Sequence, residues 1–170
     1  TLDIRQDHSV HLKLMNEIFA KNKLIKEDIS ELKEGEIVNF LLNKDFDLTT
    51  LSLKDPLLAD TVKNLIQLPE IQERNGVEAC ERYIISNSED IFSVLFVLSL
   101  LRWTTKPGHE INFDVCPLFE TMDGMRNSEQ IMRALFQNDQ YRAHVKQRGN
   151  VQTIMLGYSD GTKDGGYLKA

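Results

Sequence analysis

Cysteine is scarce in this 170-residue sequence. The two cysteines, Cys80 and Cys116, lie far apart and form no Cys-x-x-Cys spacing. Each lies beside or within an apolar, strand-like run, so we expect both to be buried free thiols. That interpretation is favoured over a disulfide or a zinc site.

Long apolar runs and an excess of positive charge are also missing. The longest apolar stretch, Ile91 to Leu101, is well short of the roughly 20 residues that a membrane-spanning helix needs. The N-terminus has no signal-peptide pattern, which favours a cytoplasmic protein. Lys and Arg number 20 against 26 Asp and Glu, and the net charge of −6 is spread along the chain. Nucleic acid and membranes are therefore disfavoured as partners.

No glycine-rich phosphate loop, serine nucleophile motif, internal repeat or low-complexity tract is visible. The chain does contain enough apolar material for a core, since 41% of its residues are hydrophobic. At this length we expect one compact unit over residues 1–170 rather than two domains.

Four short segments have the composition of strands and are separated by helical stretches. They are residues 1–5, 82–86, 113–119 and 151–158. This alternation predicts parallel βα units in a helix-rich α/β fold. Between the first two segments, residues 7–81 carry apolar positions at amphipathic spacing and are predicted to be helical.

Local signals mark where several helices begin and end. Asp55 followed by Pro56 predicts a helix start, and Asn75-Gly76 predicts a stop. Residues 88–103 are apolar nearly all round, which predicts a helix buried between a sheet and other helices. The spacing of residues 127–130 is that of a capping box and predicts a further helix start.

Two carboxylates follow the predicted strands. Glu120 comes directly after the run 115–119, and Asp160 follows the last apolar run. Both are therefore expected just beyond the C-terminal ends of neighbouring strands. Such a pair suits Mg²⁺ or Mn²⁺, which one or two carboxylates usually hold while water and substrate oxygens complete the coordination. The alternative is that each is a solvated surface acid.

Two cations accompany these carboxylates. Lys163 lies three residues after Asp160, near the start of the next predicted helix. It could face a phosphate or a carboxylate there, or be a solvated lysine in a glycine turn. Arg5 closes the first predicted strand on the same face as Asp3. Its forked guanidinium could bind phosphate, and a structural contact between Asp3 and Arg5 is the alternative.

Two weaker metal patterns are present. Residues 160–165 place Asp, Thr, Asp and Gly at positions one, three, five and six of a calcium-binding EF-hand loop. The Thr is off-pattern, and the segment before the loop is strand-like rather than helical. His8 and His11 form a His-x-x-His pair, but at the start of a polar helix we expect them to be solvated. A non-catalytic helical interaction scaffold is the remaining alternative.

Together these segments resemble phosphoenolpyruvate carboxylase along the whole chain and in the family's order. The segments concerned are Leu2-Asp-Ile-Arg-Gln6, Tyr83-Ile-Ile-Ser86, Pro117-Leu-Phe-Glu-Thr121 and Met155-Leu-Gly-Tyr-Ser-Asp160 with Lys163-Asp164. The resemblance implies a mostly helical protein built on a (β/α)8 barrel, with its site at the C-terminal ends of the strands. This chain would supply about four parallel strands, roughly half of that barrel.

The resemblance also implies an activity. Enzymes of this family join bicarbonate to phosphoenolpyruvate and release oxaloacetate and phosphate, through carboxyphosphate and an enolate, with Mg²⁺ or Mn²⁺ as cofactor. This carbon dioxide fixation replenishes the tricarboxylic acid cycle. The site residues implied here are the metal ligands Glu120 and Asp160, the phosphate-binding Arg5, the apolar pocket residues Leu118 and Met155, and the catalytic-site Lys163.

The chain departs from the family pattern in two respects. Gly161 and Thr162 stand where Ser with Gly or Ala is usual, and Gly165 replaces a usual Ala. The family's catalytic histidine, Gly-rich arginine loop and effector site fall outside these 170 residues, so we expect a fragment that is inactive in isolation. An open half-barrel has unpaired strand edges, which predicts self-association. The parent enzyme is expected to be a homo-oligomer, a tetramer in the family.

Overall fold

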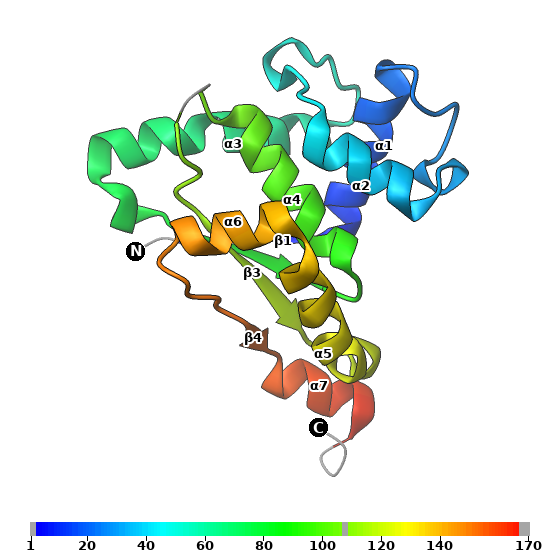
Figure 1. Cartoon of the computed structure of the whole chain (residues 1–170), viewed down its shortest axis with the longest axis vertical. Coiled ribbons are helices and arrows are strands. Elements are labelled where there is room, and N and C mark those ends of the chain that lie inside the picture. The colour runs from blue at the N-terminus through cyan, green and yellow to red at the C-terminus, as the bar shows by residue number, and fades with distance from the viewer. Residues whose placement is uncertain (1–2, 107–108, 167–170) are drawn as a thin grey trace.

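The computed structural model describes residues 3–106 and 109–166. Over these residues the chain forms an α/β fold with seven α-helices and one four-stranded parallel sheet in the order β1-β2-β3-β4 (Figure 1). The strands are β1 (Ile4–Asp7), β2 (Arg82–Ser86), β3 (Asp114–Phe119) and β4 (Met155–Leu156). The predicted α/β class and the parallel pairing are confirmed, and the closed barrel stays a prediction.

Helices fill every connection between the strands. The helices are α1 (His8–Lys21), α2 (Glu34–Asn43) and α3 (Pro56–Asn75) before β2, α4 (Ile91–Thr104) before β3, α5 (Met122–Gln137) and α6 (Asp139–Gln147) before β4, and α7 (Tyr158–Gly165) after it. Short 3₁₀ turns lie at Ile29–Glu31, Leu48–Thr50 and Val77–Ala79. Figure 1 shows α1 to α4 grouped at one end of the molecule and α7 at the other.

The ends of α3 follow the signals in its sequence. The Asp55 side chain accepts a hydrogen bond from the backbone N–H of Leu57 at 2.8 Å, and Pro56 occupies the first turn, where its missing N–H costs nothing. Gly76 ends the helix with φ +86°, a conformation that glycine adopts without strain. Both predicted boundaries of this helix are confirmed.

The start of α5 lies earlier than predicted. The Thr121 hydroxyl accepts a hydrogen bond from the N–H of Gly124 at 3.0 Å, so Thr121 is the cap and Met122 the first helical residue. The capping-box spacing at residues 127–130 is therefore inside the helix, and the start predicted there is wrong.

The core lies between the sheet and the helices and is centred on α4. Residues 93–101 of α4 are buried without interruption, as its all-round apolar sequence predicted. Tyr83 and Ile85 of β2 face this core. Within the described parts of the chain, no helix combines the length and apolarity needed to cross a bilayer.

Both cysteines are buried and unpaired, which confirms the prediction of free thiols. Cys80 belongs to the main core, and Cys116 lies on the opposite face of the sheet. Burial raises the pKa of the Cys116 thiol to about 11, so this group is a neutral apolar side chain at neutral pH.

His11 is fully buried, which contradicts the prediction that it is solvated. Its Nε2 lies 2.9 Å from the hydroxyl of Tyr83 on β2. Burial, together with the charge of His8, lowers the pKa of His11 to about 3, so the ring is neutral at neutral pH. His8, one turn earlier, stacks on Phe96 of α4. His11 and Tyr83 are 72 positions apart in the chain, so the local sequence around His11 does not reveal this contact.

The first and last strands differ most from their predicted ranges. The first is shifted to Ile4–Asp7, and residues 1–2 of the predicted range lie outside the described residues. For the last, the sequence predicted a buried strand over 151–158, but pairing with β3 covers only Met155 and Leu156. Leu156 is 70% exposed. The reason is that β4 is an edge of the described sheet, so its side chains, including that of the paired Leu156, have neighbouring strand residues on one side only.

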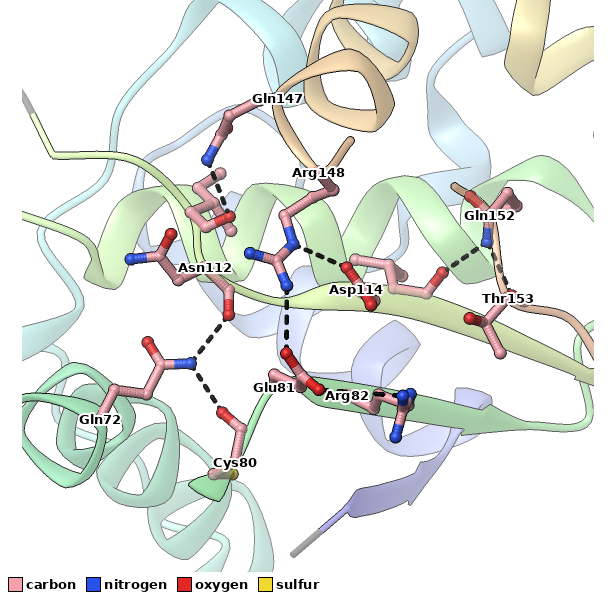
Figure 2. Close-up of polar contacts among 12 residues, drawn as sticks. Gln72, Cys80, Glu81, Arg82, Asn112, Asp114, Gln147, Arg148, Gln152 and Thr153 are labelled. Atoms are coloured by element: carbon pink, nitrogen blue, oxygen red, sulfur yellow. Dashed lines mark hydrogen bonds and ion pairs between the residues drawn. The ribbon is translucent and has the colours of Figure 1, made fainter. Parts of the chain in front are cut away.

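A polar network holds the N-terminal ends of β2 and β3 (Figure 2). Arg148, the residue after α6, donates from Nε to Asp114 at 2.7 Å, and its Nη2 lies 3.5 Å from Glu81. Gln72 of α3 donates to two backbone carbonyls in the same region, at 2.6 and 2.8 Å. These contacts are structural, and the candidate site residues lie at the opposite end of the strands.

Candidate active site

Arg5 and Glu120 form an ion pair at the C-terminal end of the sheet. Arg5 lies on β1 and Glu120 directly follows β3, and Nη2 lies 3.2 Å from Oε2. Glu120 is only 8% exposed, whereas the Arg5 side chain is 51% exposed. The alternative contact of Asp3 with Arg5 is not formed, because the Asp3 carboxylate lies 3.9 Å from Arg82 instead. Two predicted site residues from distant parts of the sequence are thus brought together.

Two residues at the end of β2, which sequence reasoning missed, complete this arrangement. Arg5 donates from Nε to the Ser86 hydroxyl at 2.6 Å. The backbone N–H of Asn87 donates to the second oxygen of Glu120 at 2.9 Å. The Asn87 side chain donates to Asp7 at 2.6 Å. Ser86 is the last residue of one of the segments that carry the family resemblance, and this position could have marked it as a candidate site residue.

An apolar surface lies beside the ion pair on the same face of the sheet. Leu118 and Met155 are register partners across β3 and β4, so the two predicted pocket residues are adjacent. They pack with Ile84 and Cys116 in a small cluster separate from the main core. Arg5 is the register partner of Ile84, and alternation along the strands therefore puts the guanidinium and the apolar cluster on one face.

Asp160 and Lys163 lie on α7 and pair with each other. Lys163 Nζ is 3.6 Å from Asp160 Oδ1, and the two side chains are 78% and 51% exposed. An exposed pair at this spacing contributes little to stability. Because residues 158–165 form a helix, residues 160–165 cannot be the EF-hand loop considered from the sequence, and that interpretation is wrong.

The helix α7 begins directly against Glu120. The N–H of Gly157 donates to the Phe119 carbonyl at 2.9 Å, and a Cβ at Gly157 would lie 2.5 Å from the Cβ of Glu120. Only glycine permits this approach. At the other end of α7, the Asp164 carboxylate accepts from the N–H of Met122, the first residue of α5, at 2.8 Å. These contacts hold the helix that carries Asp160 next to the end of β3.

The donor set at this edge suits a hard divalent cation. Each oxygen of Glu120 accepts one hydrogen bond, and a carboxylate offers about four lone-pair sites, so part of its capacity stays open. The Asp160 side chain is half exposed. Across the described ranges no three His, Cys, Asp or Glu gather in a way that could hold a metal ion. An ion such as Mg²⁺ takes most of its ligands from water and substrate, so one or two protein carboxylates can be enough to hold it.

Sequence comparison extends this picture to the whole chain. A family model described as phosphoenolpyruvate carboxylase matches residues 1–170. A phosphoenolpyruvate carboxylase of Corynebacterium diphtheriae is 34% identical over 100% of this chain and 20% of its own length. Similar enzymes of Nitrosomonas europaea and Aliivibrio salmonicida are 32% and 34% identical over 98% and 99% of this chain, and 19% and 18% of their own lengths. The chain thus spans about a fifth of these relatives, and it belongs to the phosphoenolpyruvate carboxylase family.

Proposed function

We propose that this chain is part of a cytoplasmic, homo-oligomeric phosphoenolpyruvate carboxylase. The complete enzyme joins bicarbonate to phosphoenolpyruvate and releases oxaloacetate and phosphate. The observation that carries this proposal is the family match over all 170 residues. The position of the Arg5 and Glu120 pair also supports it, because the C-terminal ends of the strands carry the active sites of (β/α)8 barrels. The four parallel strands are then one part of such a barrel.

In this proposal Arg5 binds the phosphate group of the substrate. A guanidinium carries five N–H donors, and Ser86 and Glu120 take one each. Three donors remain on a side chain that is half exposed. Two donors on one planar edge match two oxygens of a phosphate. Arg5 can therefore keep its structural contacts and bind an anion at the same time.

Glu120 and Asp160 would hold the Mg²⁺ or Mn²⁺. When bound, the ion would stabilise the negative charge that develops on the enolate oxygen of the substrate. Leu118 and Met155 would cover the methylene of phosphoenolpyruvate and exclude water from it. Lys163 adds a positive charge near Asp160 on the same helix.

The test is bicarbonate-dependent formation of oxaloacetate by the complete enzyme with Mg²⁺, comparing wild type with Asp160→Asn. We expect turnover by the wild type and a loss on the order of 100-fold or more in the variant, because a metal ligand is removed. Asp123→Asn is the matched control, since Asp123 is also exposed and ion-paired, with Arg126 on α5. No oxaloacetate from the wild type contradicts the function, and full activity of Asp160→Asn contradicts the metal role.

We expect the 170-residue chain by itself to have no turnover, since it spans about a fifth of the length of the related enzymes. Phosphate release is measured with and without bicarbonate at equal chain concentrations. Release that depends on bicarbonate would show that these residues suffice for the chemistry.

A further inference from the structure

The end of β2 contacts candidate site residues on both neighbouring strands. β2 lies between β1 and β3 in the sheet. Its last residue, Ser86, binds Arg5 of β1, and the next residue, Asn87, binds Glu120 after β3. Two consecutive residues therefore hold the two members of one ion pair.

The Ser86 contact determines how the Arg5 guanidinium is presented. Nε and Nη2 are the two nitrogens that Ser86 and Glu120 engage, and they form one edge of the planar group. The edge made by Nη1 and Nη2 stays available. A long arginine side chain loses considerable rotamer freedom when it is fixed, and the hydroxyl of Ser86, in a residue only 8% exposed, supplies a contact shielded from water.

The Asn87 contact determines how the Glu120 carboxylate is presented. Asn87 has φ +56°, a left-handed conformation that asparagine tolerates better than most residues. This conformation directs its N–H to Glu120 Oε1 at 2.9 Å. The side chain reinforces it by donating to Asp7, whose carboxylate also caps α1 by accepting from the N–H of Ser9 at 2.8 Å.

We propose that Ser86 and Asn87 are positioning residues of this site. Ser86 orients the Arg5 guanidinium toward the phosphate group of the substrate, and Asn87 orients the Glu120 carboxylate toward the divalent metal. This inference rests on the function proposed above. It assigns separate effects to two adjacent residues, because one acts through the phosphate-binding cation and the other through a metal ligand.

The Ser86 role is tested in the complete enzyme with Ser86→Ala and Ser86→Thr. Removing a hydrogen bond to a charged group should raise the KM for phosphoenolpyruvate about tenfold. The Mn²⁺ dissociation constant and the thermal midpoint should stay near those of the wild type. Ser86→Thr keeps the hydroxyl and should restore the KM. An unchanged KM in a folded Ser86→Ala enzyme overturns this role, as does a KM that Thr fails to restore.

The Asn87 role is tested by direct Mn²⁺ binding, followed by electron paramagnetic resonance without turnover. Asn87→Ala destabilises the left-handed backbone and should weaken Mn²⁺ binding about threefold or more. Asn87→Gly keeps the conformation and the N–H, so it should stay within about twofold of the wild type. If the alanine variant does not fold, Asn87→Ser removes the contact with Asp7 and also disfavours the left-handed conformation, so it should weaken binding in the same way. Wild-type binding in the folded variant tested overturns the inference.

The two levels of proposal fail in different ways. Suppose that the wild type binds Mn²⁺ but forms no oxaloacetate, and that Asn87→Ala weakens Mn²⁺ binding. The carboxylase function is then wrong, and the positioning of Glu120 by Asn87 stands. If the wild type turns over and all variants match it in KM and Mn²⁺ binding, the positioning inference alone is wrong. If the wild type neither turns over nor binds Mn²⁺, both are wrong.

Discussion

Arg148 donates from Nε to Asp114 Oδ1 at 2.7 Å, and this contact joins the end of α6 to the first residue of β3. The two side chains are only 17% and 20% exposed. The same guanidinium lies 3.5 Å from Glu81, a second sheltered carboxylate that also lies 3.8 Å from Arg82 (Figure 2). Removing Arg148 leaves the Asp114 carboxylate without its ion-pair partner and with limited access to water, and leaves Glu81 with only the more exposed Arg82.

Arg148→Met should therefore lower the free energy of unfolding by about 1–3 kcal/mol, less than for a fully buried pair because these groups are partly hydrated. Urea denaturation of the chain, followed by circular dichroism, measures this. The control is Arg133→Met, which breaks the ion pair between Arg133 and Glu129. Their side chains are 69% and 83% exposed, so this substitution should change the free energy of unfolding by less than about 0.5 kcal/mol. Equal effects of the two substitutions would contradict the prediction.

Gly157→Ala should destabilise the junction of β3 and α7. The added Cβ would lie 2.9 Å from the Cα of Glu120, a backbone atom that cannot move aside. We expect the hydrogen bond from Gly157 to Phe119 to open, which amide hydrogen exchange at residue 157 detects as a faster rate. Gly35→Ala is the control, because nothing lies within 4 Å of that Cβ and the residue is in α2. It should stabilise the chain by about 0.5–1 kcal/mol.

Stability should fall as the pH drops from about 6.5 toward 3. Burial lowers the pKa of His11 to about 3, and burial with the charge of Arg148 lowers the pKa of His144. As the pH falls, the unfolded chain, whose histidine pKa values are near 6.5, binds protons before the folded chain does. The stability that the two neutral histidines contribute is therefore fully present above pH 6.5 and is lost progressively between pH 6.5 and 3. Each group adds at most about 1.4 kcal/mol per pH unit.

Urea unfolding at pH 7.5, 6.0 and 5.0 measures this slope, with His11→Gln as the comparison. Glutamine does not titrate, so the variant should be less stable than the wild type at pH 7.5 but show a shallower dependence on pH. A slope equal to that of the wild type would mean that His11 does not carry the effect.

The chain should self-associate through the edge of β4. The outer side of this strand has no partner in the described sheet, and Leu156 on it is 70% exposed. Light scattering should therefore give a mass above 19.6 kDa that rises with concentration. Leu156→Lys should reduce it, because charge on an edge strand opposes pairing. Leu57→Lys, at an exposed leucine of α3, should not. A monodisperse wild-type monomer would contradict this prediction.

Local features of the fold were predictable because they depend on neighbouring residues. The cap at Asp55, the stop at Gly76 and the buried α4 follow from short patterns that act within one or two turns. The placement of Glu120 after β3 and the adjacency of Leu118 to Met155 followed from strand ends and from the family resemblance. Asp160 was expected just beyond the last strand and lies in the first turn of α7, whereas Lys163, expected near the start of a helix, lies in the last turn of α7.

Features that depend on tertiary packing were not predictable. The burial of His11 depends on Tyr83, and the short β4 depends on its position at the sheet edge. The glycines in the sequence of α7 are typical of a turn, but in the structure they allow this helix to pack closely against α5. A Cβ at Gly161 would collide with Met125, and one at Gly165 with Met122.

The order of strands along the sheet has a consequence for how the molecule assembles. β2 and β3 are joined through one α-helix, whereas β1 and β2 are joined through three. Closing the longer connection costs more chain entropy, so the β2-α4-β3 unit is expected to nucleate and β1 to dock afterwards. Arg5 and Glu120 are 115 positions apart, and their ion pair can form only after that docking. Their contact is therefore expected late in folding, and it reports that β1 has docked on β2.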